Sequence, residues 1–287
     1  MSDAVATSES APRVGTLPRA RSRRSFDRPR FLLVVTGATT LFLFLPILVV
    51  VAYSFNSVKS LATFQGLSLH WYRTLASDPA ALDSVRVSFG IALVTTVVAT
   101  TIGVALAIGL TRARPALAKG TEATMLLNLV SPEIATAVAL LLLFTGVGLP
   151  LGSTTITLGH ITFSIAYVTV IVRARLLGIG SELEEGAMDL GATELQGLRL
   201  VVLPLLWPAI LGAAMLVFLL SFDDFVTSFF TSGVGTPPLP LLIYGMIRFG
   251  ITPEINAIGT LMMAVTILLG VAGVFLIQFR STGRRAR

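Results

Sequence analysis

Long uninterrupted apolar segments dominate the pattern of hydrophobic and polar positions along this chain. A helix needs roughly 18 or more apolar residues to cross a bilayer, and six segments reach or approach that length: 31–53, 87–111, 123–145, 155–172, 205–230 and 255–279. They are continuous instead of alternating at every second residue, so they indicate helices rather than barrel strands. The segment 155–172 is the weakest, since it carries a histidine and many hydroxyl groups. The pattern predicts an all-α integral membrane protein with six transmembrane helices.

The connections between these segments have patterns of their own. Residues 54–86 contain a short amphipathic helix pattern that is broken at Pro79, whereas 146–154 is short, Gly-rich and uncharged, as in a tight turn. The stretch 173–204 is long, charged and helical in pattern. The apolar decapeptide near 239–249 is too short to span a bilayer, so it predicts an interfacial or re-entrant helix.

Charged residues make up only 13% of the 287 residues, and the basic ones are unevenly placed. If the N-terminus is cytoplasmic, all Lys and Arg residues fall on the cytoplasmic side except Lys59, Arg73, Arg86 and Arg248. This bias is typical of cytoplasmic loops and predicts that both termini are cytoplasmic. Topology thus accounts for the net charge of +6, and no nucleic-acid partner is predicted.

The same pattern divides the chain into three parts. Residues 1–30 are rich in Ser, Ala, Pro and Arg without periodicity, which indicates a disordered basic cytoplasmic tail. Residues 31–280 form the expected transmembrane domain, with a cytoplasmic loop at 173–204, and 281–287 form a second cytoplasmic tail. A cleaved signal peptide is disfavoured because the first apolar run is longer than a signal-peptide core and no small-residue cleavage site follows it.

Several kinds of chemistry lack the residues they need. The chain has no cysteine, which excludes disulfides and thiolate metal sites, and no GxxxxGK[ST] loop, so it is not expected to hydrolyse ATP. His70 and His160 are isolated in sequence, so neither a metal site nor a Ser/His/Asp set is indicated. His160 is expected to satisfy hydroxyl groups or cap the fourth span. The sequence predicts no cofactor and no enzyme.

Three acids lie inside the apolar segments. Counting from Lys119, Glu133 follows after about 14 residues, or about 21 Å of helix, which places it near the middle of the bilayer. Asp223 and Asp224 fall in the outer half of the fifth span. A charge at the bilayer centre costs on the order of 3 kcal/mol on insertion scales. These carboxylates are therefore expected to face a cavity or a partner.

An intramembrane salt bridge, or a protonated acid bonded to Ser and Thr, is the alternative explanation of these acids. However, no Lys or Arg lies in the core of a span, so a partner of opposite charge is expected to be missing from this chain. Three unpaired carboxylates along one aqueous path would attract a cation. Nearby hydroxyls such as that of Ser221, and several phenylalanines, suit the ammonium groups and methylenes of an amine.

The loop 173–204 carries a specific motif. Ser181 and Glu184 have the spacing of a capping box that would start a helix. The following residues resemble the EAA signature of ABC importer permeases, in which a cytoplasmic coupling helix docks on the ATPase subunit. The matching positions are Glu185, Gly186, Ala187, Gly191, Val201, Val202, Leu203 and Pro204. Gly186 replaces the usual second Ala and Val201 the usual Ile, and both substitutions keep the small or β-branched character.

From about residue 30 to 280 the chain resembles the PotC-type permeases of spermidine/putrescine importers. The resemblance is carried by SPEIATAVALLLLF (131–144), GHITFSIAYV (159–168), LSFDDFV (220–226) and PLLIYGMIRFGITPEINA (240–257). It implies a type I ABC importer permease fold (MetI-like) in a bacterial inner membrane. The implied partners are cytoplasmic ABC ATPase subunits, a second permease subunit in a heterodimer, an extracytoplasmic solute-binding protein and membrane lipid.

The resemblance also implies roles for individual residues. It places Trp71, Glu133, Ser221, Asp223 and Asp224 on the substrate pathway, and Glu185, Ala187, Gly191, Leu203 and Pro204 at the contact with the ATPase. Trp71 could equally anchor the membrane interface, where indoles gather. Two alternatives of function stay open: a permease for another solute (an opine, another amine, a metal chelate or an anion), and a proton-coupled secondary transporter, which would be expected to show paired inverted repeats.

Overall fold

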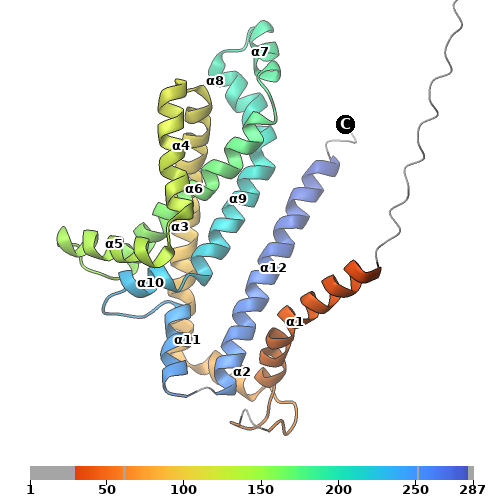
Figure 1. The fold of residues 1–287 in the computed structure, drawn as a ribbon, viewed down its shortest axis with the longest axis vertical. Helices are drawn as coiled ribbons and strands as arrows, with labels where there is room; N and C mark the ends of the chain where they lie inside the picture. The colour runs from red at the N-terminus through yellow and green to blue at the C-terminus, as the bar shows by residue number, and fades with distance from the viewer. Residues whose placement is uncertain (1–29, 61–62, 251, 284–287) are drawn as a thin grey trace, which may run out of the picture. The chain divides into compact units, whose positions relative to one another are not determined.

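The computed structural model describes residues 30–60, 63–250 and 252–283, with side chains described as far as Phe275. Most of the described residues lie in helices (Figure 1). The elements are α1 (Arg30–Ser54), α2 (His70–Ser77), α3 (Pro79–Arg112), α4 (Pro115–Val130), α5 (Glu133–Gly146), α6 (Ser153–Leu177), α7 (Glu182–Asp189), α8 (Glu194–Gly197), the π-helical turn η1 (Leu198–Val202), α9 (Leu203–Asp223), α10 (Val226–Thr231), α11 (Leu239–Arg248) and α12 (Pro253–Gly283). Apart from Arg30, the predicted N-terminal tail lies outside the described residues, as do 284–287 of the predicted C-terminal tail.

The chain divides into two units, and the boundary in the sequence falls within α1, between Ile47 and Leu48. In the first unit, the described part of α1 from Arg30 to Ile47 is apolar around its whole circumference, as expected of a helix that faces lipid. The second unit, from Leu48 onward, contains all the other helices.

Five described helices are long and apolar enough to cross a membrane, and a bent helix pair raises the number to six. The six predicted segments are thus found, but the prediction that the third is one continuous helix is wrong. Segment 123–145 is divided between α4 and α5, whose axes differ by 107°. The break falls at Ser131 and Pro132, because proline lacks an N–H and disfavours helical geometry in the residue before it. Ser131 is accordingly extended, with φ −60° and ψ 139°.

The predicted fifth span, 205–230, is also too long. Helix α9 ends at Asp223, Asp224 is extended, and the chain resumes in the short helix α10. The helix therefore stops at the pair of aspartates that interrupts the apolar run.

The core of the second unit lies where α3, α6 and α9 pack against one another (Figure 1). Small residues allow the close approach, as is usual between membrane helices. Gly103 of α3 is the tightest of these contacts: a Cβ atom there would lie 2.6 Å from the Cβ of Val168 on α6. Ala99, Ala107 and Ala213 are completely buried in the same cluster.

At one end of this core, α2, α11 and α12 form a second cluster. The short amphipathic helix predicted within 54–86 is present as α2, and the short helix predicted at 239–249 is present as α11. The break at Pro79 is confirmed as well, because Pro79 starts α3 and the side chain of Asp78 caps it by accepting from the Ala80 N–H. Leu239 at the start of α11 donates its N–H to Ser88 of α3, which ties α11 to the core.

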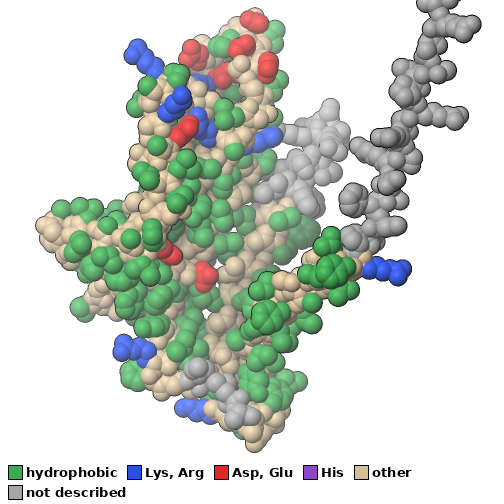
Figure 2. All heavy atoms as spheres, viewed as in Figure 1, with side chains coloured by type: hydrophobic (Ala, Val, Ile, Leu, Met, Phe, Trp, Pro, Cys, Tyr) green, Lys and Arg blue, Asp and Glu red, His purple; other side chains and the backbone are tan. Residues whose placement is uncertain are grey.

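At the opposite end, the loop between α6 and α9 contains α7, α8 and η1 (Figure 1). Charged side chains of both signs gather there, over α4, α7 and α8 (Figure 2). A helix starts at Glu182 as predicted, but the capping box is wrong: Ser181 makes no capping hydrogen bond. Glu184 instead forms an ion pair with Arg112 at the end of α3. The capping box of this loop is formed by Thr193 and Gln196 on α8.

Candidate functional site

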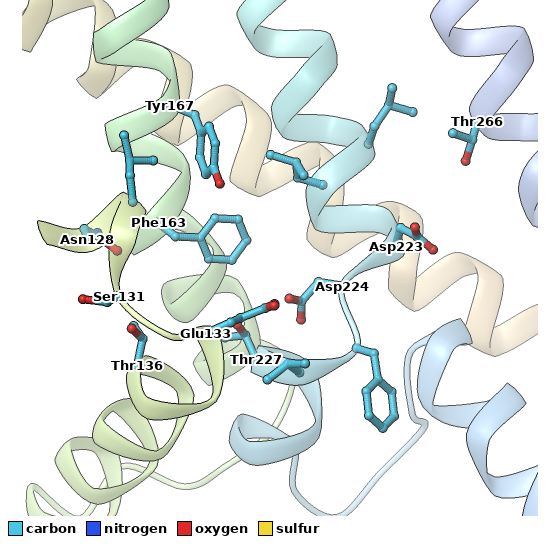
Figure 3. A pocket seen from close by; sticks show the side chains of 15 residues that line it. Asn128, Ser131, Glu133, Thr136, Phe163, Tyr167, Asp223, Asp224, Thr227 and Thr266 are labelled. Carbon is cyan, nitrogen blue, oxygen red and sulfur yellow. The ribbon is translucent and has the colours of Figure 1, made fainter. Parts of the chain in front are cut away.

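A cavity of about 640 Å³ lies where the two helix breaks meet (Figure 3). Its walls come from α4, α5, α6, α9, α10 and α12, and none of its lining side chains is basic. The lining residues are Asn128, Leu129, Ser131, Glu133, Thr136, Phe163, Tyr167, Leu219, Leu220, Asp223, Asp224, Phe225, Val226, Thr227 and Thr266. Acidic side chains are visible in the middle of an otherwise apolar face (Figure 2). The three acids predicted inside the membrane therefore share one cavity.

The helix breaks explain why acids can occupy this place. Glu133 is the first residue of α5, directly after Pro132, so its carboxylate lies beside the free N–H groups of a helix start. Asp223 is the last residue of α9, and Asp224 lies in the extended link to α10. The carboxyl group of Glu133 points toward that of Asp224 (Figure 3).

Asp224 is the most firmly held of the three acids. Its side chain is buried, with 8% of the residue exposed. One carboxylate oxygen, Oδ2, accepts a hydrogen bond from the N–H of Ser228 at 2.8 Å and lies 3.0 Å from Nε2 of His160. We expected these acids to have no internal partner of opposite charge, and sequence reasoning overlooked the hydrogen-bond partner that the imidazole of His160 provides for Asp224.

His160 is the residue next to the cavity that sequence reasoning undervalued. It lies on α6 with 1% of its surface exposed, and its Nδ1 is 2.7 Å from the hydroxyl of Ser221 while Nε2 is also 3.2 Å from that of Ser228. The prediction that it satisfies hydroxyl groups is confirmed. Its additional contact with Asp224 joins residues 64 positions apart. A histidine within the least apolar span was the signal available in the sequence.

Asp223 and Glu133 differ from Asp224, because both are exposed. Asp223 makes no hydrogen bond or ion pair with the described part of the chain, and its carboxylate points away from Asp224 (Figure 3). The carboxylate of Glu133 points toward Asp224 and is open to the cavity (Figure 3). The cavity therefore presents two available carboxylates and one that the protein already binds.

Aromatic side chains form part of the cavity wall. Phe163 and Tyr167 come from α6, and Phe225 follows the aspartates (Figure 3). Phe225 is fixed by ring contacts with Phe229 and with Tyr244 of α11, at centroid distances of 5.5 and 5.0 Å. Such surfaces can contact both methylenes and ammonium groups.

Two of the predicted pathway residues do not line the cavity. Ser221 is buried, and its hydroxyl contacts His160, which in turn contacts Asp224. Trp71 is also buried, and its indole N–H donates to the carbonyl of Asn56 at 2.8 Å. Trp71 belongs to the cluster that contains Phe222, the neighbour of Asp223. The structure thus brings Glu133, Asp223 and Asp224 together, with Ser221 behind them and Trp71 outside the cavity wall.

The residues predicted to contact an ATPase lie at the other end of α9. Glu185 and Ala187 are on α7, Gly191 is in the turn after it, and Leu203 and Pro204 begin α9. Gly191 has φ +93° and no neighbouring atom within 4 Å of a Cβ placed there. Leu190 beside it is 92% exposed. This turn is an open, partly apolar surface.

Comparison with known proteins places this architecture in a family. The profile of the family described as binding-protein-dependent transport system inner membrane component matches residues 99–285. The spermidine/putrescine transport system permease protein PotC of Haemophilus influenzae is 38% identical over 246 residues, or 86% of this chain and 94% of that protein. The putrescine transport system permease protein PotI of Escherichia coli K12 is 38% identical over 265 residues, covering 90% and 93%.

Solved structures give the same fold. A methionine ABC transporter, MetNI, matches with a TM-score of 0.60 and 21% identity over 69% of this chain and 94% of that chain. A bacterial ABC transporter that imports alginate matches with a TM-score of 0.70 and 13% identity over 86% and 95%.

The chain belongs to the family of inner-membrane components of binding-protein-dependent transport systems. It is a multi-pass permease subunit of an ABC importer, with the all-α, MetI-like fold that the resemblance to PotC-type permeases implied.

Proposed function

We propose that this permease forms the translocation path of a polyamine importer and that the cavity between the two helix breaks is where the cation passes. One observation carries the proposal: three carboxylates and no basic side chain line a single cavity inside the membrane segments. The volume of about 640 Å³ falls within the range of small-molecule sites. Relatives that are 38% identical over most of both chains are permeases of spermidine/putrescine and putrescine systems.

The chemistry of the cavity suits a flexible polycation. An ammonium group that leaves water needs a nearby carboxylate to offset its desolvation. Asp223 and Glu133 are exposed and can supply one each, while the hydroxyls of Thr136 and Thr227 can accept further hydrogen bonds. Phe225 offers an apolar face for the methylenes between the ammonium groups. An anion permease would instead need basic groups or converging N–H groups at this place.

The remaining parts of the importer are assigned by the same reasoning. The open turn around Gly191 would receive a separate ATPase subunit, which would hydrolyse the ATP. This assignment makes the α7–α8 end cytoplasmic, and with it both termini. The opposite end, with α2 and α11, would face an extracytoplasmic solute-binding protein, and a second permease would complete the pathway as a heterodimer.

The absence of cysteine in this chain allows a direct test of the cavity's charge. Ser131 is exposed and lines the cavity, so Ser131→Cys in the complete importer reports on ions that enter it. A cationic and an anionic methanethiosulfonate of similar size would be compared by their labelling rates, read by mass spectrometry on this chain. The cationic reagent should react faster, and Glu133→Gln with Asp223→Asn should remove most of the difference.

The expected size of the effect follows from Coulomb's law. For an assumed separation of about 8 Å and an effective dielectric constant between about 20 and 80, each carboxylate changes the energy of a unit charge by about 0.5–2 kcal/mol. Solvent around the exposed groups favours the lower half of that range. Two carboxylates acting oppositely on the two reagents should give a rate ratio of about tenfold or more. Equal rates for the two reagents in the unmodified cavity would refute the cation pathway.

Transport provides the second arm of the test. Glu133→Gln with Asp223→Asn should strongly reduce uptake of radiolabelled spermidine or putrescine while the ATPase activity stimulated by the binding protein persists. A cation-selective cavity with no uptake of either amine would instead indicate another cationic solute.

A further inference from the structure

His160 connects both sides of the break between α9 and α10. Ser221 lies on α9, Asp224 lies in the extended link and Ser228 lies on α10, and the imidazole contacts all three. The ring is almost completely buried, and its two nitrogens face different elements. One side chain of α6 therefore holds together the three parts of a discontinuous helix.

The packing around His160 supports a dedicated role for this part of α6. The residue before it is Gly159, where a Cβ atom would lie 2.8 Å from Cγ2 of Thr227 on α10. Only glycine allows α10 to approach so closely, and that approach brings Ser228 and Asp224 to the imidazole. The glycine and the histidine thus contribute to one contact, the first through its size and the second through its hydrogen bonds.

The hydrogen-bond directions assign a proton to Nε2. An ionised Asp224 can only accept, and its Oδ2 already accepts from the N–H of Ser228. Nε2 must therefore donate to Oδ2. Nδ1 then either accepts from the hydroxyl of Ser221 or, in the imidazolium form, donates to it. In both cases the imidazole fixes the direction of the Asp224 carboxylate.

We propose that His160 is a positioning residue of the translocation path. It holds Asp224 as a fixed part of the wall, so that Asp223 and Glu133 are the carboxylates that take the ammonium groups of the solute. The inference rests on the proposed function for the identity of the cavity, and it assigns different roles to the adjacent aspartates. Loss of the His160 contact frees the α9–α10 link and removes the fixed geometry of the pair formed by Asp224 and Glu133.

Two amide variants separate hydrogen bonding from packing. The amide nitrogen of Gln can take the place of Nε2, whereas that of Asn takes the place of Nδ1. His160→Gln should therefore keep the contact with Asp224, and His160→Asn should lose it. In the complete importer, at matched abundance, we expect polyamine uptake within about threefold of normal for His160→Gln. For His160→Asn we expect at least a tenfold loss, with ATPase activity stimulated by the binding protein retained.

A double-mutant comparison tests whether His160 acts through Asp224. If it does, adding His160→Asn to Asp224→Asn should reduce uptake much less than it does in the unmodified protein. Ser221→Ala removes only the partner of Nδ1 and leaves the imidazole ring in place. It therefore tests the role of His160 even if the histidine variants are not found in the membrane at sufficient abundance. We expect two- to fivefold slower uptake from it.

Three results would overturn the proposal: equal losses for the Gln and Asn variants, full additivity with Asp224→Asn, or normal uptake with Ser221→Ala. The Ser131→Cys labelling ratio of the unmodified cavity distinguishes this failure from failure of the proposed function. A cationic preference with any of these three results refutes only the role of His160. Absence of the preference refutes the cation pathway itself.

Discussion

The adjacent aspartates should respond in opposite ways to the same substitution. In Asp224→Asn the side chain keeps its size but loses its charge, so the bonds from His160 Nε2 at 3.0 Å and from the Ser228 N–H at 2.8 Å become neutral. Charge-assisted bonds contribute about 1.5–3 kcal/mol each and neutral ones about 0.5–1.5 kcal/mol. The change should therefore destabilise the protein by about 1–3 kcal/mol.

Asp223→Asn removes a charge that no described group compensates. The substitution also removes the energetic cost of a charged carboxylate within the membrane segments, so the stability of the protein should stay unchanged or increase slightly. Asp224→Asn does not gain this relief, because removing one member of a buried pair leaves the other without its partner. Both variants replace Asp by Asn at adjacent positions, so each is the matched control of the other.

The assay measures the thermal stability of the purified importer. After heating, gel filtration gives the fraction that still elutes as the intact complex, and the midpoint is the temperature at which this fraction is one half. For a large domain, about 1 kcal/mol corresponds to roughly 2–4 °C, so a loss of about 1–3 kcal/mol in Asp224→Asn should lower the midpoint by about 2–12 °C. Asp223→Asn should stay within about 2 °C of the unmodified importer and yet transport amine poorly. Equal midpoints for the two variants, or a more stable Asp224→Asn protein, would contradict the contacts described for Asp224.

Three further predictions concern other parts of the molecule. Gly191→Trp should abolish uptake and also binding of the ATPase subunit, measured by cross-linking. Gly191→Ala has the same backbone strain at φ +93° without the bulk, so it should retain most of both. Retained ATPase binding by the Trp variant would refute the docking assignment. Gly103→Ala should destabilise the protein by about 1–3 kcal/mol through overpacking against α6, while Gly109→Ala, whose Cβ would meet open space, should be neutral in the same heating assay. Reporter fusions should place residues 60–80 outside and residue 190 in the cytoplasm; an external residue 190 would reverse the proposed orientation.

The membrane segments could be predicted from the sequence because length and continuity of apolar runs are local properties. The break at Pro132 was also present in the sequence, yet the apolar residues on both sides conceal it, since hydropathy averages over a window and does not register one missing N–H. The acids Glu133, Asp223 and Asp224 were identified for a physical reason that held: a carboxylate in an apolar run needs a cavity or a partner.

The distinction between the two aspartates could not be predicted. It depends on His160, whose partners Ser221 and Asp224 are 61 and 64 residues away in the chain. No periodicity within α6 or α9 specifies that these residues meet. The incorrect capping box has a similar cause, because the carboxylate of Glu184 is taken by Arg112 from a different helix.

The uninterrupted helix from α8 through η1 to the end of α9 has a mechanical consequence. Its 30 residues, Glu194–Asp223, correspond to a rod of about 45 Å. The π-helical turn keeps the backbone helical where the loop joins the span, and α9 continues past its internal Pro208 to Asp223. If it pivots near Glu194, a tilt of about 5° moves Asp223 sideways by about 4 Å over that length. A tilt of this helix thus displaces Asp223, whereas Glu133 lies on α5 and does not move with it.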